Sequence, residues 1–110
     1  MLEAVHKNLA EGRWFEMSLA SQLGNVGSEV NRVVMWRKKA DIEKETKAKE
    51  RALELFDLTL SDNRWKGRFK ELTRAREALV DSFYNFNEYN STLEDLNKYF
   101  YYFAYAARCQ

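Results

Sequence analysis

The residues of this chain that could support acid–base or metal chemistry are carboxylates on predicted helices. Glu29 and Asp57 lie beside the apolar positions of two helical segments, and Arg76 occupies an apolar position of a third. Di-metal helical bundles combine such inward carboxylates with Glu-x-x-His motifs. The only histidine is His6, and no Glu-x-x-His occurs, so we expect no metal site and no cofactor. The pattern favours an internal ion pair between Arg76 and either Glu29 or Asp57.

Nucleophilic catalysis and nucleotide binding lack the groups that they need. The single cysteine, Cys109, would have to meet His6 across the fold, and no third group is placed to orient the pair. The stretch GNVGSE, residues 24–29, has two glycines but neither the lysine nor the preceding strand of a phosphate-binding loop. We therefore expect no catalytic residues and a protein that is not an enzyme.

Basic residues are concentrated in one part of the sequence. Residues 64–76 contain six basic side chains and one acidic side chain, whereas residues 77–97 contain five acidic side chains and no basic one. The net charge is only +1, so any binding of a polyanion must come from this uneven distribution. In an up-and-down bundle the start of the third helix shares an end with the start of the first and the close of the fourth. This topology predicts a basic pole made of Arg13, Arg64, Lys66, Arg68, Lys70 and Arg108.

Aromatic residues lie among these charges. Trp65 and Tyr102 are the rings that we expect to contact a bound base or a partner, because nucleobases and guanidinium groups stack on aromatic faces. Cations in the opening turn of a helix oppose its dipole, so Arg64 and Lys66 are locally unfavourable there. Two alternatives stay open: the rings partly cover the core, and the basic run is a solvated face.

Small residues form a strip on the first predicted helix. Ala20, Gly24 and Gly27 fall on one side of it, and Ser21 and Ser28 flank them. Two glycines inside a helix cost roughly 1 kcal/mol each relative to alanine, and close packing of a neighbouring helix can offset that cost. The neighbour is either another helix of the same chain or a helix of a second subunit.

Hydrophobic periodicity predicts four helices. The first spans about 13–39, the second about 43–60, the third begins near residue 64, and the fourth begins at about 92 after a Ser91–Glu94 capping box. The inward residues expected on these helices are Leu19, Leu23, Val26, Val30 and Val33, then Leu53, Phe56 and Leu60, then Trp65, Phe69, Leu72, Leu79, Phe83 and Phe86, and finally Leu93, Leu96, Phe100, Phe103 and Ala107. Short turns between them predict an all-α, antiparallel up-and-down four-helix bundle over residues 13–110, preceded by an N-terminal arm over residues 1–12.

The composition supports this fold class. The chain has 110 residues, no proline, 45 % hydrophobic and 15 % aromatic residues, which is typical of one folded helical domain and not of a disordered chain. No apolar run is long enough to span a membrane, and no signal peptide is evident. We expect a cytoplasmic protein with no membrane partner.

Several stretches resemble known families. The segments AEGRWFEMSLASQLGNVGSEVNRVV, RALELFDLTLSD, FKELTRAREALVD and YFYYFAYAAR resemble a family of small helical prokaryotic proteins that carries no catalytic motif. The architecture and the basic surface are more loosely similar to the four-helix accessory proteins of diversity-generating retroelement reverse transcriptases. That resemblance implies an oligomeric protein that binds the enzyme together with its template RNA.

Two functions follow as hypotheses. The first is a non-enzymatic, oligomeric accessory protein whose basic pole holds RNA, DNA or a nucleoprotein partner such as a reverse transcriptase. The second is a protein-only scaffold or adaptor that docks through its oppositely charged ends and through the small-residue strip.

Overall fold

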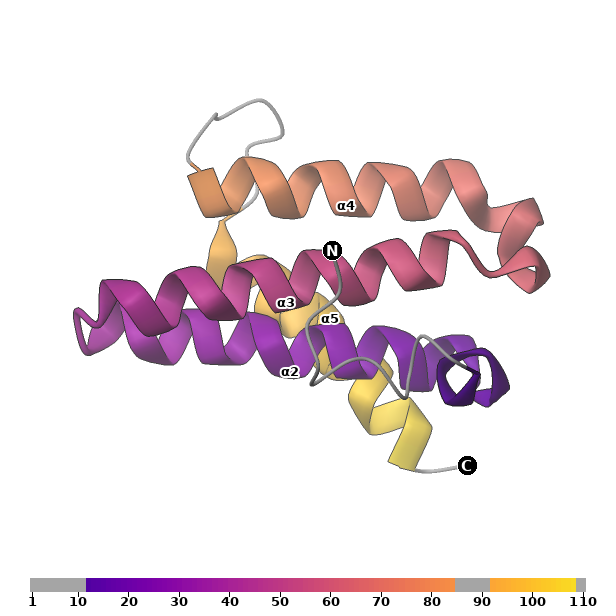
Figure 1. The fold of residues 1–110 in the computed structure, drawn as a ribbon, viewed down its shortest axis with the longest axis horizontal. Coiled ribbons are helices and arrows are strands. Elements are labelled where there is room, and N and C mark those ends of the chain that lie inside the picture. Colours follow the sequence, from indigo (N-terminus) through magenta and orange to yellow (C-terminus); the bar gives the residue numbers. More distant parts are fainter. Residues whose placement is uncertain (1–11, 85–91, 109–110) are drawn as a thin grey trace.

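The computed structural model describes residues 12–84 and 92–108, and these form an all-α four-helix bundle. The elements in chain order are the 3-10 helix η2 (Arg13–Glu16), α2 (Leu19–Lys38), α3 (Ile42–Leu60), the 3-10 helix η3 (Asn63–Arg68), α4 (Phe69–Tyr84) and α5 (Leu93–Arg108). Consecutive long helices run in opposite directions (Figure 1). The predicted fold class is confirmed, while predictions for the arm, His6, Phe86, Ser91 and Cys109 fall on residues 1–11, 85–91 and 109–110, outside the described part.

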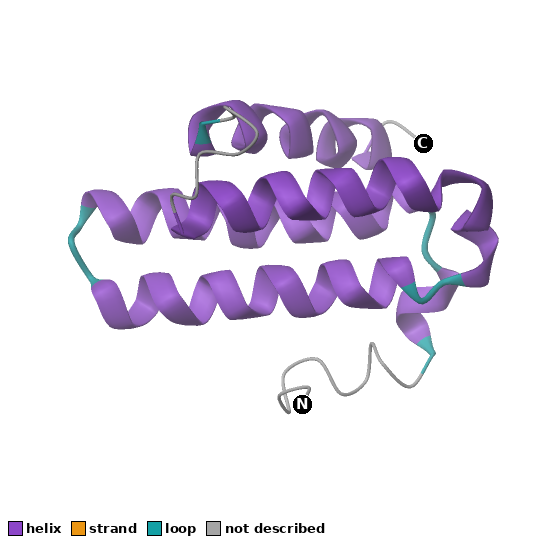
Figure 2. Ribbon diagram, turned by 90° about the horizontal axis from the view of Figure 1, so that it is seen from above, coloured by secondary structure: helices purple, strands orange, loops and turns teal. Residues whose placement is uncertain are grey.

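Helix α2 is the centre of the bundle. It packs closely against α3 on one side and against α5 on another, while α4 lies on the far side of α3 (Figure 1). Helix α5 crosses behind α2 and α3 and forms one edge of the molecule when viewed from above (Figure 2). Among the described helices, none is long and apolar enough to cross a membrane.

The apolar stripe of α2 is buried as its spacing predicts. Leu19, Leu23, Val26, Val30 and Val33 are each less than 10 % exposed. The prediction of one continuous helix over 13–39 is wrong, however. The Ser18 side chain accepts a hydrogen bond from the Ser21 amide and so caps a new helix, and the extended backbone at Met17 separates α2 from η2. The separate turn buries Trp14 completely.

The α2–α3 turn and α3 bring small side chains into the core. Asp41 caps α3 by accepting a hydrogen bond from the Lys44 amide, at 3.1 Å. The most buried apolar residues of α3 are Ala48, Ala52, Leu55 and Phe56, whereas Leu53 and Leu60, which periodicity places inward, are only half-buried. The two alanines are consistent with the short separation between α2 and α3.

The third predicted helix begins later than expected. Residues 63–68 form η3, which is kinked at Trp65, and the α-helix starts only at Phe69. Leu72, Leu79 and Phe83 are buried as predicted, but Phe69, which was expected to face inward, is 53 % exposed.

The last helix is placed almost as expected. Leu93, Leu96 and Phe100 are buried, and Phe103 and Ala107 are half-buried. The predicted start at residue 92 is one residue early, because Thr92 itself caps α5 by accepting a hydrogen bond from the Asp95 amide at 3.0 Å.

Candidate functional site

The structure divides the predicted basic pole into two groups. η2 and η3 lie at the same end of the molecule, where Arg64 Nη2 donates to the Met17 carbonyl at 2.7 Å (Figure 1). This end therefore holds Arg13, Arg64, Lys66, Arg68 and Lys70. The C-terminal half of α5, which contains Tyr102 and Arg108, ends below α2 in Figure 1, whereas η3 lies above it. The two parts are on different sides of α2.

Arg64 is held in place by Asp62. The guanidinium donates to both carboxylate oxygens, with the shortest contact 2.7 Å from Nη2 to Oδ2, and the Arg64 amide donates to Oδ1. The Asp62 side chain is 4 % exposed, and these hydrogen bonds from Arg64, with another from Gln22, lower the pKa of its carboxyl from 3.8 to about 2. Arg64 thus joins the start of α2 to the α3–η3 turn.

Gln22 and Trp65 complete this junction. The fully buried Gln22 donates from Nε2 to the Trp14 carbonyl at 2.8 Å and to Asp62 Oδ2 at 3.0 Å. Its Oε1 accepts a hydrogen bond from Trp65 Nε1 at 2.9 Å, and the Arg64 guanidinium lies 4.5 Å from the centre of the Trp65 ring. Trp65 is half-buried and its polar atom is already paired, so this ring supports the fold at the place where sequence analysis expected a binding platform.

Four further basic residues, Lys66, Arg68, Lys70 and Arg74, are exposed on η3 and α4. Arg68 pairs with Glu71 at 2.9 Å, and this hydrogen bond lowers the pKa of the Glu71 carboxyl. Lys66, Lys70 and Arg74 are exposed and make no ion pair with another described residue. We call these three residues the basic strip. Arg74 belongs to the basic run over residues 64–76 but was not among the residues of the predicted pole, although its four-residue spacing from Lys70 places both on one face of α4.

The expected internal ion pair is partly wrong. Arg76 pairs with Asp57, whose oxygen Oδ1 lies 2.8 Å from Nε, but the Asp57 side chain is 59 % exposed, so the pair is on the surface. Glu29 does not contact Arg76. Its carboxylate is almost buried and pairs with Arg32 at 2.8 Å and with Arg51 of α3 at 3.3 Å. Arg51, which was not among the predicted partners, is the residue that joins Glu29 to the next helix.

The small-residue strip is covered by α5 of the same chain. A Cβ atom built on Gly24 would lie 2.9 Å from the Ala104 Cα atom, and one built on Gly27 would lie 2.6 Å from the Phe100 Cβ atom. Ala20 is half-buried beside them. The glycines therefore let the backbones of α2 and α5 meet at a distance that no side chain permits.

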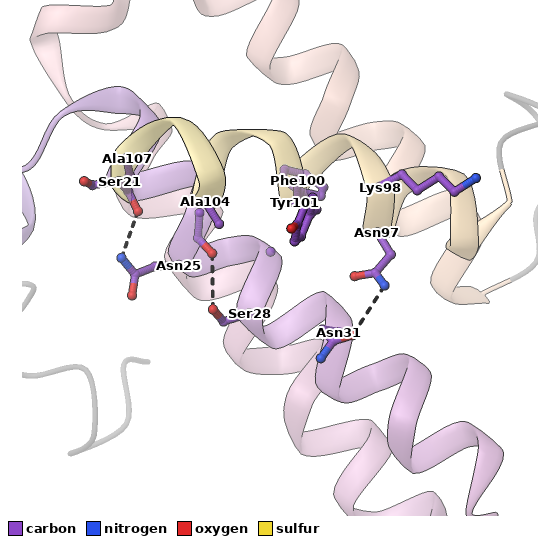
Figure 3. A pocket seen from close by; sticks show the side chains of 12 residues that line it. Ser21, Asn25, Ser28, Asn31, Asn97, Lys98, Phe100, Tyr101, Ala104 and Ala107 are labelled. Carbon is purple, nitrogen blue, oxygen red and sulfur yellow. Dashed lines mark hydrogen bonds between the residues drawn. The ribbon is translucent and has the colours of Figure 1, made fainter. Parts of the chain in front are cut away.

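An open groove of about 710 Å³ lies beside this contact (Figure 3). Short polar residues of α2 and both polar and apolar residues of α5 line it, and Asn97 of α5 donates to Asn31 of α2 at 3.4 Å. Asn25 and Ser28 donate to carbonyls of their own helix, as the dashed lines in Figure 3 show. Lys98 is the only charged residue that lines it among those described.

Comparisons with protein-family models, with curated proteins and with solved structures give no match. Within residues 12–84 and 92–108, no three His, Cys, Asp or Glu side chains are grouped so that they could hold a metal ion.

Proposed function

We propose that this chain is a non-enzymatic binding protein that holds nucleic acid, or a nucleoprotein partner such as a reverse transcriptase with its RNA, through the basic strip. The observation that carries this proposal is the state of Lys66, Lys70 and Arg74, which are exposed and unpaired among the described residues. Neighbouring cations such as Arg64 and Arg68 are already neutralised by carboxylates. Unpaired cations gain the most from phosphate contacts, because no existing ion pair must break.

An exposed ring accompanies the strip. Phe69 is 53 % exposed and precedes Lys70 directly at the start of α4. A base that stacks on an aromatic side chain gains about 1–3 kcal/mol, and this gain depends little on sequence. Phe69 therefore takes the place of Trp65 as the aromatic contact, and the site should bind structured RNA or DNA with little sequence preference.

The experiment is a titration of fluorescently labelled structured RNA and duplex DNA, followed by anisotropy at low and physiological salt. The test variant carries Lys66→Glu, Lys70→Glu and Arg74→Glu. The matched control carries Lys38→Glu, Lys44→Glu and Lys47→Glu, which make the same charge change at the α2–α3 turn, at the opposite end of α3. Arg64 is left intact in both, because its reversal would break the Asp62 junction.

We expect wild-type binding to weaken steeply with salt. The strip variant should lose at least about tenfold in affinity and show a salt slope smaller by about 2–3, since three phosphate contacts are removed. The control should bind almost as the wild type does. Equal losses in both variants would show that only total charge matters, and no binding at low salt would leave the protein-only adaptor as the better hypothesis.

A further inference from the structure

The outer face of α5 carries an exposed stripe of aromatic residues. Lys98, Tyr101, Tyr102 and Tyr105 follow one another at steps of three, one and three, which places them on one face of the helix. The three tyrosines are 57 %, 69 % and 57 % exposed, whereas Leu96 and Phe100 on the other face are buried. We call these four residues the tyrosine stripe.

These rings make few contacts with the described part of the molecule. Tyr101 and Tyr102 meet each other edge to face, with ring centres 6.3 Å apart. Figure 2 shows α5 at the edge of the bundle, so its outer face is accessible from that side. Tyrosine is enriched in protein interfaces, and three such rings gathered on one helix face form a patch that monomeric proteins rarely leave uncovered.

The tyrosine stripe is complementary to a second copy of itself. When two α5 helices lie antiparallel about a midpoint between residues 101 and 102, Tyr101 of each copy lies opposite Tyr102 of the other. The same register places Lys98 opposite Tyr105, which is a cation–π pair. Both pairs occur twice, as a two-fold axis requires.

The open groove beside the stripe gives a second helix room to approach. Lys98 and Tyr101 belong to both the stripe and the groove, and the groove wall on α2 consists of short side chains such as Ser21, Asn25 and Ser28. The side chains of serine and asparagine can also donate hydrogen bonds to, or accept them from, a tyrosine hydroxyl of the second copy. Large side chains on this wall would have kept a partner away.

We infer that the tyrosine stripe is a homodimer interface in which the α5 helices of two copies pair antiparallel. The second copy is the occupant because Lys98 of each copy meets Tyr105 of the other, and Tyr101 meets Tyr102, in this register. The interface does not depend on the proposed nucleic-acid binding, since the basic strip is on η3 and α4. It also differs from a dimer built on Gly24 and Gly27, which α5 of the same chain already covers.

Sedimentation equilibrium of the full chain tests the interface. We expect the wild type to have twice the monomer mass of 13.1 kDa. Tyr101→Glu combined with Tyr102→Glu should give a monomer with unchanged helicity, because four carboxylates would meet at the two-fold axis. The control, Ile42→Glu combined with Phe69→Glu, alters residues that are 76 % and 53 % exposed on other faces and should remain dimeric.

A charge exchange tests the antiparallel register. Lys98→Glu removes the cation–π pair and Tyr105→Lys sets two cations opposite each other, so each change alone should weaken dimerisation by about tenfold or more. The double variant sets a carboxylate opposite an ammonium at both symmetric positions and should dimerise more tightly than either single variant. Within one helix these residues are about 10 Å apart, too far for an ion pair that would mimic this rescue.

Four results would overturn the inference. The first is a wild-type chain that stays monomeric at high micromolar concentration. The second is an assembly that survives the two tyrosine substitutions, which would place the interface on another face. The third is a double variant no tighter than its single variants, which would exclude the antiparallel register. The fourth is a wild-type monomer whose unfolding temperature falls when Tyr101 and Tyr102 are replaced, which would show that the stripe is covered within its own chain.

Discussion

Arg64, Trp65 and Lys66 are consecutive in sequence, yet the first two hold the fold together and the third is unpaired among the described residues. Asp62 causes this difference. Its buried carboxylate accepts hydrogen bonds from Arg64 and from Gln22, and Gln22 in turn accepts a hydrogen bond from Trp65. A cluster of basic and aromatic residues therefore cannot be interpreted from composition alone. Its meaning depends on which side chains a buried acid has already engaged.

The pH dependence of stability should report this junction. Folding lowers the pKa of Asp62 from 3.8 to about 2, so its ionised form stabilises the folded state above pH 4, and that contribution is lost as the pH falls from about 4 to 2. The shift corresponds to about 2 kcal/mol. Asp62→Asn should be less stable than the wild type at pH 7 and equally stable near pH 2, as measured by urea unfolding. A stability difference that is constant across this range would show that Asp62 acts by hydrogen bonding alone.

At the scale of the elements, the close packing of α2 against α5 requires that Gly24 and Gly27 have no side chain. Gly24→Ala should destabilise the fold even though alanine favours a helix by about 1 kcal/mol, because the new Cβ would lie 2.9 Å from the Ala104 backbone and would force α5 away. We expect a loss of about 1–3 kcal/mol in the free energy of unfolding, measured by urea denaturation.

Gly67→Ala is the matched control for this change. Gly67 has open space around it, since a Cβ atom there meets nothing within 4 Å, and its substitution should be neutral or slightly stabilising. Equal effects at both positions would mean that α5 can shift away from Gly24 at little cost.

Sequence periodicity predicted the number and direction of these helices because each has a continuous apolar face. It placed every inward residue of α2 correctly, from Leu19 to Val33. It failed at Ser18 and at Trp65, where the backbone leaves the α-helix. A serine before an apolar residue was a readable capping signal, but Trp65, where the kink lies, donates a hydrogen bond to Gln22, 43 residues away, and no local pattern reveals such a contact.

The binding surfaces were harder to predict than the helices. The sequence identified the basic run, but not that Arg64 and Arg68 are neutralised, because these ion pairs depend on local geometry. It also gave Asp57 and Glu29 as equal partners for Arg76. Only the packing of α2 on α3 shows that Glu29 forms its ion pair with Arg51 of α3 and not with Arg76.

At the scale of the whole molecule, the helices differ in how firmly they are held. Helix α2 packs closely on both α3 and α5, while α4 lies on the far side of α3 and packs chiefly against that one helix (Figure 1). Local opening follows the least supported elements. The basic strip and Phe69 are on η3 and α4, so the proposed nucleic-acid surface belongs to the part of the bundle that should open most easily.

Native-state hydrogen exchange would measure this difference. The amides around Leu72 and Leu79 in α4 should exchange through openings of lower free energy than the amides around Val26 and Val30 in α2, which should exchange only on global unfolding. Bound RNA should slow exchange in α4 more than in α2, because phosphate contacts along the basic strip stabilise the closed helix. If α4 and α2 exchange with the same opening free energy, the bundle unfolds as one cooperative unit, and α4 is held as firmly as α2 despite packing chiefly on α3.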